Sequence, residues 1–255
     1  MIHLAAALDK PELMDAVNVE ATRRLVAQSA DQGIRYFGYA SSIVVYGSPR
    51  SRLVDERSPR IAPYAPIASQ YHAEPYMLEY ARTKAAAEIA IEALNLPMIV
   101  DLYRPAVVVD DSDLLRAGNW SMARKIFASY RRTQFITAVD AAAAIVHLME
   151  RGLAIGGRTH APIEAYNLVD NNVGTYRALF AAAYQATGDA RFKVILDVPV
   201  IMDFVKDFVR YRNVTLRYPL GMLRISAEKL LATGFVFPVG IDRAIGAAIG
   251  RLTAS

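Results

Sequence analysis

Two side chains able to move a proton, Tyr80 and Lys84, lie four residues apart in the segment YARTK. In a helix this spacing places both side chains on one face, one turn apart. A free tyrosine has a pKa of about 10 and is a poor acid or base at neutral pH. A nearby ammonium group favours the phenolate, so we expect Lys84 to lower the pKa of Tyr80. The pair predicts proton transfer to or from a substrate oxygen.

Ser42 could complete this chemistry. The segment YASSIVVYG at 39–47 indicates a strand that ends at a pair of serines. Residues that face a ligand in parallel sheets lie at this carboxyl end of the strands. The Ser42 hydroxyl, or that of its neighbour Ser41, could then hydrogen-bond a substrate oxygen while Tyr80 moves the proton. Tyr-x-x-x-Lys alone is a weak motif, and a partly buried tyrosine beside a solvated lysine is the structural alternative.

The elements that must position these residues alternate between buried strands and helices. The apolar run 2–7 predicts a strand covered on both faces, and a helix follows from Pro11 to a stop at Gly33. The next expected elements are a strand over 34–42, a proline-rich loop over 48–75, a helix over 76–94 and a strand over 96–110. This order predicts a parallel sheet with helices on its faces, so the fold class is α/β.

Beyond Asp110 the alternation weakens. The segment 133–150 predicts a short strand that runs into a helix, and 165–170 predicts a further strand. We expect a helix over 175–187 that Gly188 ends, and a mostly helical segment over 199–224. Two short amphipathic helices should follow, over 225–235 and 241–252.

Composition excludes several classes of function. The 255 residues include no cysteine, so disulfides and thiolate metal sites are absent, and the four histidines show no metal-ligand spacing. The formal net charge is +4, yet no block of basic residues suggests binding to nucleic acid. No apolar run approaches the roughly 20 residues of a membrane span. We therefore expect a cytoplasmic protein that acts on a small molecule, without nucleic acid, membrane or metal as partner.

Eight segments in order resemble the extended short-chain dehydrogenase/reductases, the NAD-dependent epimerase/dehydratase family. Each is short, but their order along nearly the whole chain makes the resemblance specific. The segments are HLAA at 3–6, NVEAT at 18–22, SSIVVYG at 41–47, YARTKAAAE at 80–88, YRPAVVV at 103–109, FITAVDAAAAIV at 135–146, YNLVD at 166–170 and LLATGF at 230–235.

The resemblance implies roles for single residues. Tyr80 would be the catalytic acid or base, Ser42 its partner, and Lys84 would hold the nicotinamide ribose and lower the pKa of Tyr80. The cofactor would be NAD or NADP. Residues implied to bind it, besides Tyr80 and Lys84, are Leu4, Ala5, Ala6, Ala40, Pro105 and Val107.

The implied fold is the C-terminal half of a Rossmann-like doubly wound parallel sheet with a small, mostly helical substrate-binding region. Residues 1–110 would form a partial dinucleotide-binding core. Residues 111–255 would bind substrate, with the strand near 165–169 returning to the sheet. The implied reaction is oxidoreductase or epimerase chemistry at a secondary alcohol or ketone. A homodimer through the helices at 12–32 and 76–95 is expected by analogy.

One part of the family pattern is missing. Family chains begin with a strand and a Gly-x-x-Gly-x-x-Gly turn that receives the cofactor pyrophosphate, and this sequence lacks that turn. The missing half would take about 60 residues. A misplaced start, a short protein of altered function and a protein completed by a partner are the three explanations. The gap puts cofactor binding by this chain alone in doubt, and the alternative function is a non-catalytic relative that binds a ligand or partner.

Two further departures concern the substrate. Val107 stands where sugar-nucleotide epimerases of the family often carry asparagine, which puts a nucleotide sugar in doubt. Arg210, Arg212 and Arg217 could meet a diphosphate, but a solvated basic face is the alternative.

Overall fold

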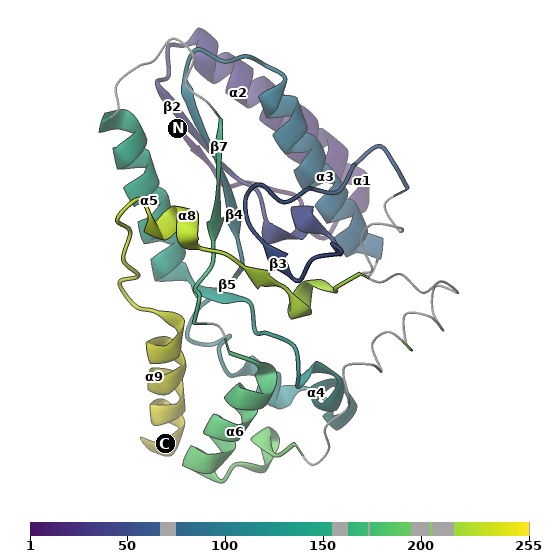
Figure 1. Ribbon diagram of the computed structural model, residues 1–255, viewed down its shortest axis with the longest axis vertical. Coiled ribbons are helices and arrows are strands. Elements are labelled where there is room, and N and C mark those ends of the chain that lie inside the picture. Colours follow the sequence, from purple (N-terminus) through teal and green to yellow (C-terminus); the bar gives the residue numbers. More distant parts are fainter. Residues whose placement is uncertain (67–74, 155–162, 173, 195–204, 206–216, 255) are drawn as a thin grey trace.

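The computed structural model describes residues 1–66, 75–154, 163–172, 174–194, 205 and 217–254. A four-stranded sheet lies at its centre, with strand order β1-β2-β4-β7 (Figure 1). All three strand pairings are parallel, which confirms the expected sheet and the α/β class. The strands are β1 (Ile2–His3), β2 (Tyr36–Ala40), β4 (Ile99–Pro105) and β7 (Glu164–Leu168).

Helices cover both faces of this sheet (Figure 1). Phe37, Val100 and Leu102 pack against α2 and α3 on one face, in a cluster with Val26 and Ile91. On the other face lies α5, which packs against β2 and β4. The helices on the first face are α1 (Pro11–Met14), a π-helical segment (Asp15–Ala21), α2 (Thr22–Asp31) and α3 (Pro75–Glu92), and the helix on the second is α5 (Ala138–Ala154).

The first strand is shorter than predicted. We expected 2–7 to be a strand covered on both faces, but β1 ends at His3, and Leu4, Ala5 and Ala6 are exposed. The reason is the position of β1, which pairs only with β2 among the described strands and so lies at the edge of the sheet. Apolar composition alone does not distinguish such an edge strand from a central one.

A close approach of backbone and side chain requires glycine at position 38. A Cβ atom there would lie 2.5 Å from the hydroxyl oxygen of Tyr103 and 2.8 Å from the Cδ1 atom of Ile2. The Tyr103 hydroxyl in turn lies 2.5 Å from that of Tyr36, which donates a hydrogen bond to Asp101 at 2.6 Å. These buried polar groups lie on the α5 side of the sheet, where the Tyr36 ring approaches Gly152 of α5.

Apart from β3 and the turn Ile43–Tyr46, the remaining described elements follow β4 in sequence (Figure 1). Strand β5 (Val107–Val109) pairs in parallel with β6 (Phe135–Thr137), and β3 (Leu53–Val54) pairs in parallel with β8 (Arg224–Ile225). The helices are α4 (Met122–Ala128), α6 (Tyr176–Thr187), α8 (Glu228–Leu231) and α9 (Ile241–Ala254), and single 3-10 turns occupy Ile43–Tyr46, Arg116–Asn119, Ala190–Phe192 and Leu220–Met222.

Helix α6 begins and ends where the sequence predicted, at Thr175 and Gly188. The Thr175 hydroxyl accepts a hydrogen bond from the Ala178 amide at its start, and Gly188 ends it in a left-handed conformation, with φ of 66°. Most of the predicted helix over 199–224 lies outside the described residues. The described C-terminal part of this segment forms the 3-10 turn Leu220–Met222 and the start of strand β8 rather than an α-helix. Among the described helices, none combines the length and apolarity needed to cross a bilayer.

Candidate functional site

Lys84 is held in a buried, polar position between α3 and β2. Its ammonium group donates hydrogen bonds to the carbonyl oxygen of Ala40 at 2.6 Å and to the hydroxyl of Tyr39 at 3.3 Å. The side chain is almost fully buried, and this burial lowers its pKa to about 8. The end of β2 and the face of α3 are therefore tied together at the position where the sequence predicted chemistry.

Tyr80 lies one turn earlier on α3, with the Lys84 ammonium 5.7 Å from the centre of its ring. Burial raises the pKa of Tyr80 to about 12, which differs from the lowering that we expected from Lys84. The physical reason is that the Lys84 ammonium is directed to Ala40 and Tyr39, and no hydrogen bond joins it to the Tyr80 hydroxyl in the described part of the chain. Desolvation thus outweighs the positive charge in this arrangement.

Ser42 lies two residues beyond the end of β2 and caps the start of the 3-10 turn Ile43–Tyr46. Its hydroxyl accepts a hydrogen bond from the Val44 amide at 3.4 Å. The turn packs in one apolar cluster with Ala81 and Ala85 of α3, and Tyr80 packs against this cluster. The fold therefore brings the strand end that carries Ser42 against the helix that carries Tyr80 and Lys84.

The residues predicted to line the cofactor lie beyond the carboxyl ends of three adjacent strands. Leu4, Ala5 and Ala6 follow β1, Ala40 ends β2, and Pro105 ends β4. The first three are exposed, Ala40 and Pro105 are partly exposed, and Val107 is 48% exposed. Of these residues, Ala40 contacts the buried Lys84 through its carbonyl oxygen. This edge of the sheet is where parallel sheets bind ligands.

One residue that holds this site together, Asn18, is missing from the predicted set. It is fully buried in the π-helical segment, and its amide accepts from the Ala7 amide at 2.7 Å and donates to the Ala7 carbonyl oxygen at 3.0 Å. It also donates to the Thr83 hydroxyl at 3.1 Å. The segment after β1 is thereby fastened to α3, next to Lys84. Asn18 lies within the segment NVEAT, so the signal was present, but no pattern in the sequence shows which backbone it binds.

A buried ion pair fixes the end of β4 relative to α3. Arg104 donates to both carboxylate oxygens of Glu88, at 3.0 and 2.7 Å, and to the Tyr46 hydroxyl at 2.8 Å. Glu88 is fully buried, and its hydrogen bonds from Arg104 help to hold its pKa below the usual range although burial alone would raise it. The Tyr46 hydroxyl donates to the side-chain oxygen of Asn167 in β7 at 2.7 Å. These hydrogen bonds connect four elements around the candidate site: β4, α3, the 3-10 turn that ends at Tyr46, and β7. Those donated by the Arg104 guanidinium are charge-assisted.

A cavity of about 760 Å³ opens next to Val107. Its wall is aromatic and basic: the Trp120 and Tyr176 rings lie 5.0 Å apart, and the Arg124 guanidinium lies 4.1 Å from the centre of the Trp120 ring. The lining residues are Val107, Trp120, Arg124, Phe127, Ala128, Arg131, Arg132, Thr133, Gln134, Tyr176, Val205, Leu220 and Gly221. Such a wall suits a substrate with a flat or apolar part and a negative charge.

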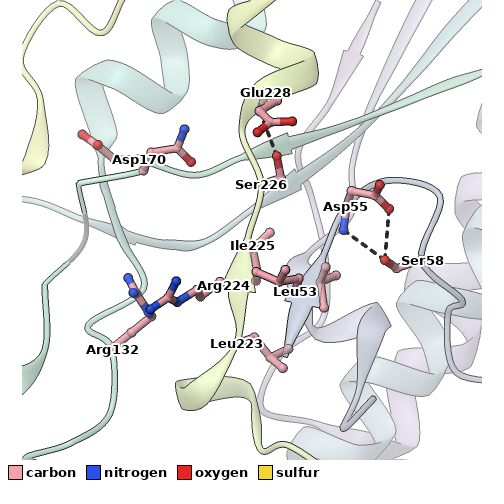
Figure 2. A pocket seen from close by; sticks show the side chains of 12 residues that line it. Leu53, Asp55, Ser58, Arg132, Asp170, Leu223, Arg224, Ile225, Ser226 and Glu228 are labelled. Carbon is pink, nitrogen blue, oxygen red and sulfur yellow. Dashed lines mark hydrogen bonds between the residues drawn. The ribbon is translucent and has the colours of Figure 1, made fainter. Parts of the chain in front are cut away.

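A second cavity, of about 520 Å³, lies beside strand β8 and is lined by none of the predicted site residues (Figure 2). Figure 2 shows Arg132 and Arg224 side by side on its wall. The Asp170 carboxylate, also on the wall, accepts hydrogen bonds from the Asn172 and Ile241 amides, both at 2.8 Å. Its role is therefore to hold backbone in place.

The three arginines considered for a diphosphate do not form a described cluster. Arg217 donates to the Ser48 carbonyl oxygen at 3.1 Å, whereas Arg210 and Arg212 lie outside the described residues. The arginines that line the cavity beside Val107 are Arg124, Arg131 and Arg132, which carried no sequence motif.

Comparisons with solved structures identify the fold. A short-chain dehydrogenase/reductase superfamily protein from Agrobacterium tumefaciens with bound NAD matches at a TM-score of 0.67 and 20% identity, over 98% of this chain and 77% of that one. MoeE5 in complex with UDP-glucose and NAD gives 0.64 and 17%, over 100% and 79%. A UDP-N-acetylglucosamine 4-epimerase from Bacillus cereus gives 0.63 and 14%, over 98% and 78%. No curated protein matches the chain in sequence.

The sequence also matches a family profile. A profile of NAD-binding proteins, described as "Male sterility protein", covers residues 1–151. The profile and the structural matches confirm the resemblance to the extended short-chain dehydrogenase/reductases, a class of enzymes with NAD or NADP as cofactor. Because the match spans more than half of the 255 residues, the chain belongs to this NAD-binding family.

Proposed function

We propose that the protein catalyses NAD(P)-dependent oxidoreductase or epimerase chemistry at a secondary alcohol or ketone. The observation that carries the proposal is the buried Lys84, fixed at the end of β2 by Ala40 and placed 5.7 Å from the Tyr80 ring. Tyr80 would exchange a proton with the substrate oxygen, and Ser42 would hydrogen-bond that oxygen. Lys84 would supply the positive charge that stabilises the phenolate.

The residues that would hold the cofactor are Lys84 and Tyr80 at the ribose, with Leu4, Ala5, Ala6, Ala40, Pro105 and Val107 around the nicotinamide end. When bound, the nicotinamide supplies the acceptor or donor of hydride. What this chain contributes is the orientation of the substrate oxygen, the proton at Tyr80 and the charge at Lys84.

We further propose that the substrate is a small molecule with a negatively charged group and a flat or apolar part. The cavity beside Val107 supports this class, because it joins the Trp120 and Tyr176 rings to the Arg124 guanidinium. Relatives in fold are described with UDP-glucose or as UDP-sugar epimerases, and nucleotide sugars are members of the proposed class. A homodimer through 12–32 and 76–95 is proposed by analogy, and sedimentation velocity measures it directly.

Replacing Tyr80 with phenylalanine tests the proton-transfer step. Tyr80→Phe keeps the ring and removes the hydroxyl, so turnover should fall at least about a hundredfold. The Kd for NAD(P)H should stay within about twofold, because the ring remains in place. The assay follows nicotinamide absorbance with a panel of charged secondary alcohols and ketones. Tyr76→Phe is the control, since Tyr76 lies on the same helix with 48% of its surface exposed. Equal turnover in Tyr80→Phe and the unaltered protein would contradict the assignment.

The rival proposal is a non-catalytic relative that binds a ligand or partner. It applies if the protein holds no nicotinamide, because Tyr80 and Lys84 then have little to act on. Titration of the chain with NADH and NADPH separates the two proposals. Micromolar binding contradicts the rival, whereas no binding at millimolar cofactor supports it.

A further inference from the structure

Two arginines line one side of the cavity of about 520 Å³ beside strand β8, and a third lies close to them. Figure 2 shows Arg132 and Arg224 together on this side. Arg52 directly precedes β3, and its carbonyl oxygen accepts a hydrogen bond from the Arg224 amide at 2.8 Å. Burial, followed by the charges of Arg224 and Arg52, lowers the pKa of Arg132. Positive charge is therefore concentrated at one side of the cavity.

Hydrogen bonds to the main chain hold the three segments that carry these arginines together. The Arg132 amide donates to the Gly221 carbonyl oxygen at 2.7 Å, just before β8. Strand β8, which carries Arg224, pairs in parallel with β3. Nε of Arg52 donates to the Met222 carbonyl oxygen at 3.0 Å. The positions from which the three side chains extend are therefore set before a ligand binds, which lowers the cost of ordering the site.

The other polar groups on the wall suit an anion placed at the arginines. The Ser226 hydroxyl accepts from the Glu228 amide at 3.1 Å, so its O–H can donate to a ligand. The Asp170 carboxylate accepts from two backbone amides, and that of Asp55 accepts from a backbone amide and the Ser58 hydroxyl. Figure 2 shows Asp55 and Glu228 apart from the two arginines. Their charges therefore act on the far end of a ligand, where they favour polar, uncharged groups.

Arg132 belongs to two cavities at once. It lines the β8 cavity and also the cavity beside Val107, where we propose that the substrate binds. Neighbouring residues of one segment divide between the two: 220–221 line the Val107 cavity, whereas 223–226 line the β8 cavity. The two cavities are therefore neighbours that share one guanidinium group.

We propose that the β8 cavity is a second ligand site, which binds a small molecule through a carboxylate or phosphate group held by Arg132 and Arg224. Arg52 adds attraction at longer range. The ligand is distinct from the substrate, because Arg124 and the Trp120 ring line the Val107 cavity and not this one. A bound anion engages the Arg132 guanidinium and so weakens its attraction for a negative group in the Val107 cavity. This last effect rests on the proposed function, whereas binding of the anion does not.

Titration with inorganic phosphate and with malonate, each at constant ionic strength, tests the site. NMR of protein with ¹⁵N-labelled arginine follows the Nε signals of Arg132 and Arg224, which Arg132→Gln and Arg224→Gln assign by their loss. Both signals should shift and saturate, with a Kd below about 5 mM for at least one anion. The anion that binds more tightly shows whether the group is a phosphate or a carboxylate. Arg224→Gln, followed at Arg132, should raise the Kd at least about tenfold.

Two variants with the same change of charge locate the site. Arg35→Gln alters an exposed arginine next to the amino end of β2, and Arg124→Gln alters the Val107 cavity but not the β8 cavity. Both should leave the Kd for the anion within about twofold of its original value. A retained NMR spectrum shows that each variant folds. If Arg124→Gln weakens binding as much as Arg224→Gln, the anion does not bind in the β8 cavity alone and the inference is wrong.

Two further outcomes overturn the inference: no saturable shift at Arg132 and Arg224 with either anion, or an equal Kd in Arg224→Gln and the unaltered protein. None of these measurements needs a nicotinamide or turnover. An anion site in an inactive protein would therefore separate failure of the proposed function from failure of this inference. In an active protein, the tighter anion should raise KM for a negatively charged substrate, and should raise it less in Arg224→Gln. An equal rise in both proteins would contradict the coupling through Arg132.

Discussion

Burial acts in opposite directions on the two proton-carrying side chains of the candidate site. It lowers the pKa of Lys84 to about 8 and raises that of Tyr80 to about 12. At pH 7 both groups therefore hold their protons, one as an ammonium and the other as a phenol. In the proposed reaction, this resting pair would donate a proton to a carbonyl oxygen. The opposite direction requires Tyr80 to lose its proton first, so alcohol oxidation should gain more than carbonyl reduction when the pH rises.

A second single residue, Asp101, should make stability depend on pH. Burial raises its pKa to about 6, whereas in an unfolded chain an aspartate has a pKa of about 3.9. As the pH rises through this window the unfolded state loses its proton first, so the stabilising contribution present below pH 4 is lost above pH 6. Asp101→Asn stays neutral and can still accept the hydrogen bond from Tyr36. It should increase the free energy of unfolding at pH 7 by about 1–3 kcal/mol, with little effect at pH 4.

Urea unfolding of Asp101→Asn at the two pH values checks this expectation. The control is Asp31→Asn, because Asp31 is exposed at the end of α2. It should change the free energy of unfolding by less than about 0.5 kcal/mol at either pH. An equal gain at pH 4 and pH 7 for Asp101→Asn would show that titration of Asp101 is not the cause.

At the level of elements, the π-helical segment Asp15–Ala21 is the joint between β1 and α3. Asn18, inside it, binds both backbone groups of Ala7 and the hydroxyl of Thr83. Asn18→Ala removes the partner of the partly buried Ala7 amide and carbonyl, whereas the Thr83 hydroxyl still bonds the Glu79 and Tyr80 carbonyl oxygens. The variant should lower the free energy of unfolding by about 1–3 kcal/mol. The Ala7 amide should exchange with water faster in the variant, which native-state hydrogen exchange measures.

A control lies on the same segment. Glu20 is exposed and pairs with Arg23 at 3.2 Å, so Glu20→Ala should cost less than about 1 kcal/mol. An Ala7 amide that exchanges equally slowly in Asn18→Ala and the unaltered protein would mean that Asn18 does not hold this backbone.

The elements also show what the sequence could and could not predict. The helical spacing and the glycine stop in the sequence predicted α6 correctly. The reason is that Thr175 and Gly188 act through local hydrogen bonds and backbone conformation. The extent of β1 was wrong, because whether an apolar run is central or at an edge depends on strands far away in sequence. The faces of α3 followed from spacing, but the direction of the Lys84 ammonium did not. It depends on the Ala40 carbonyl, which only the folded sheet supplies.

At the level of the whole molecule, the sheet should exchange its amide protons in a graded way. Strands β2 and β4 are each paired on both sides and covered by helices on both faces, whereas β1 has one described neighbour. The amides of Tyr39 and Leu102 should therefore exchange at least about a hundredfold more slowly than that of His3. Hydrogen exchange followed by NMR measures all three in one experiment. Equal protection of His3 would indicate that another strand pairs with the open edge of β1 in solution.

The contact between Gly38 and Tyr103 limits how this fold can vary. Since a Cβ atom at position 38 would collide with the Tyr103 ring, the two positions share one fixed volume. In homologous sequences, an aromatic residue at 103 should therefore occur with glycine at 38, and a larger residue at 38 should be accompanied by a smaller one at 103. This covariation would link two neighbouring strands, β2 and β4, and identify chains that keep the hydrogen-bonded tyrosines beneath α5.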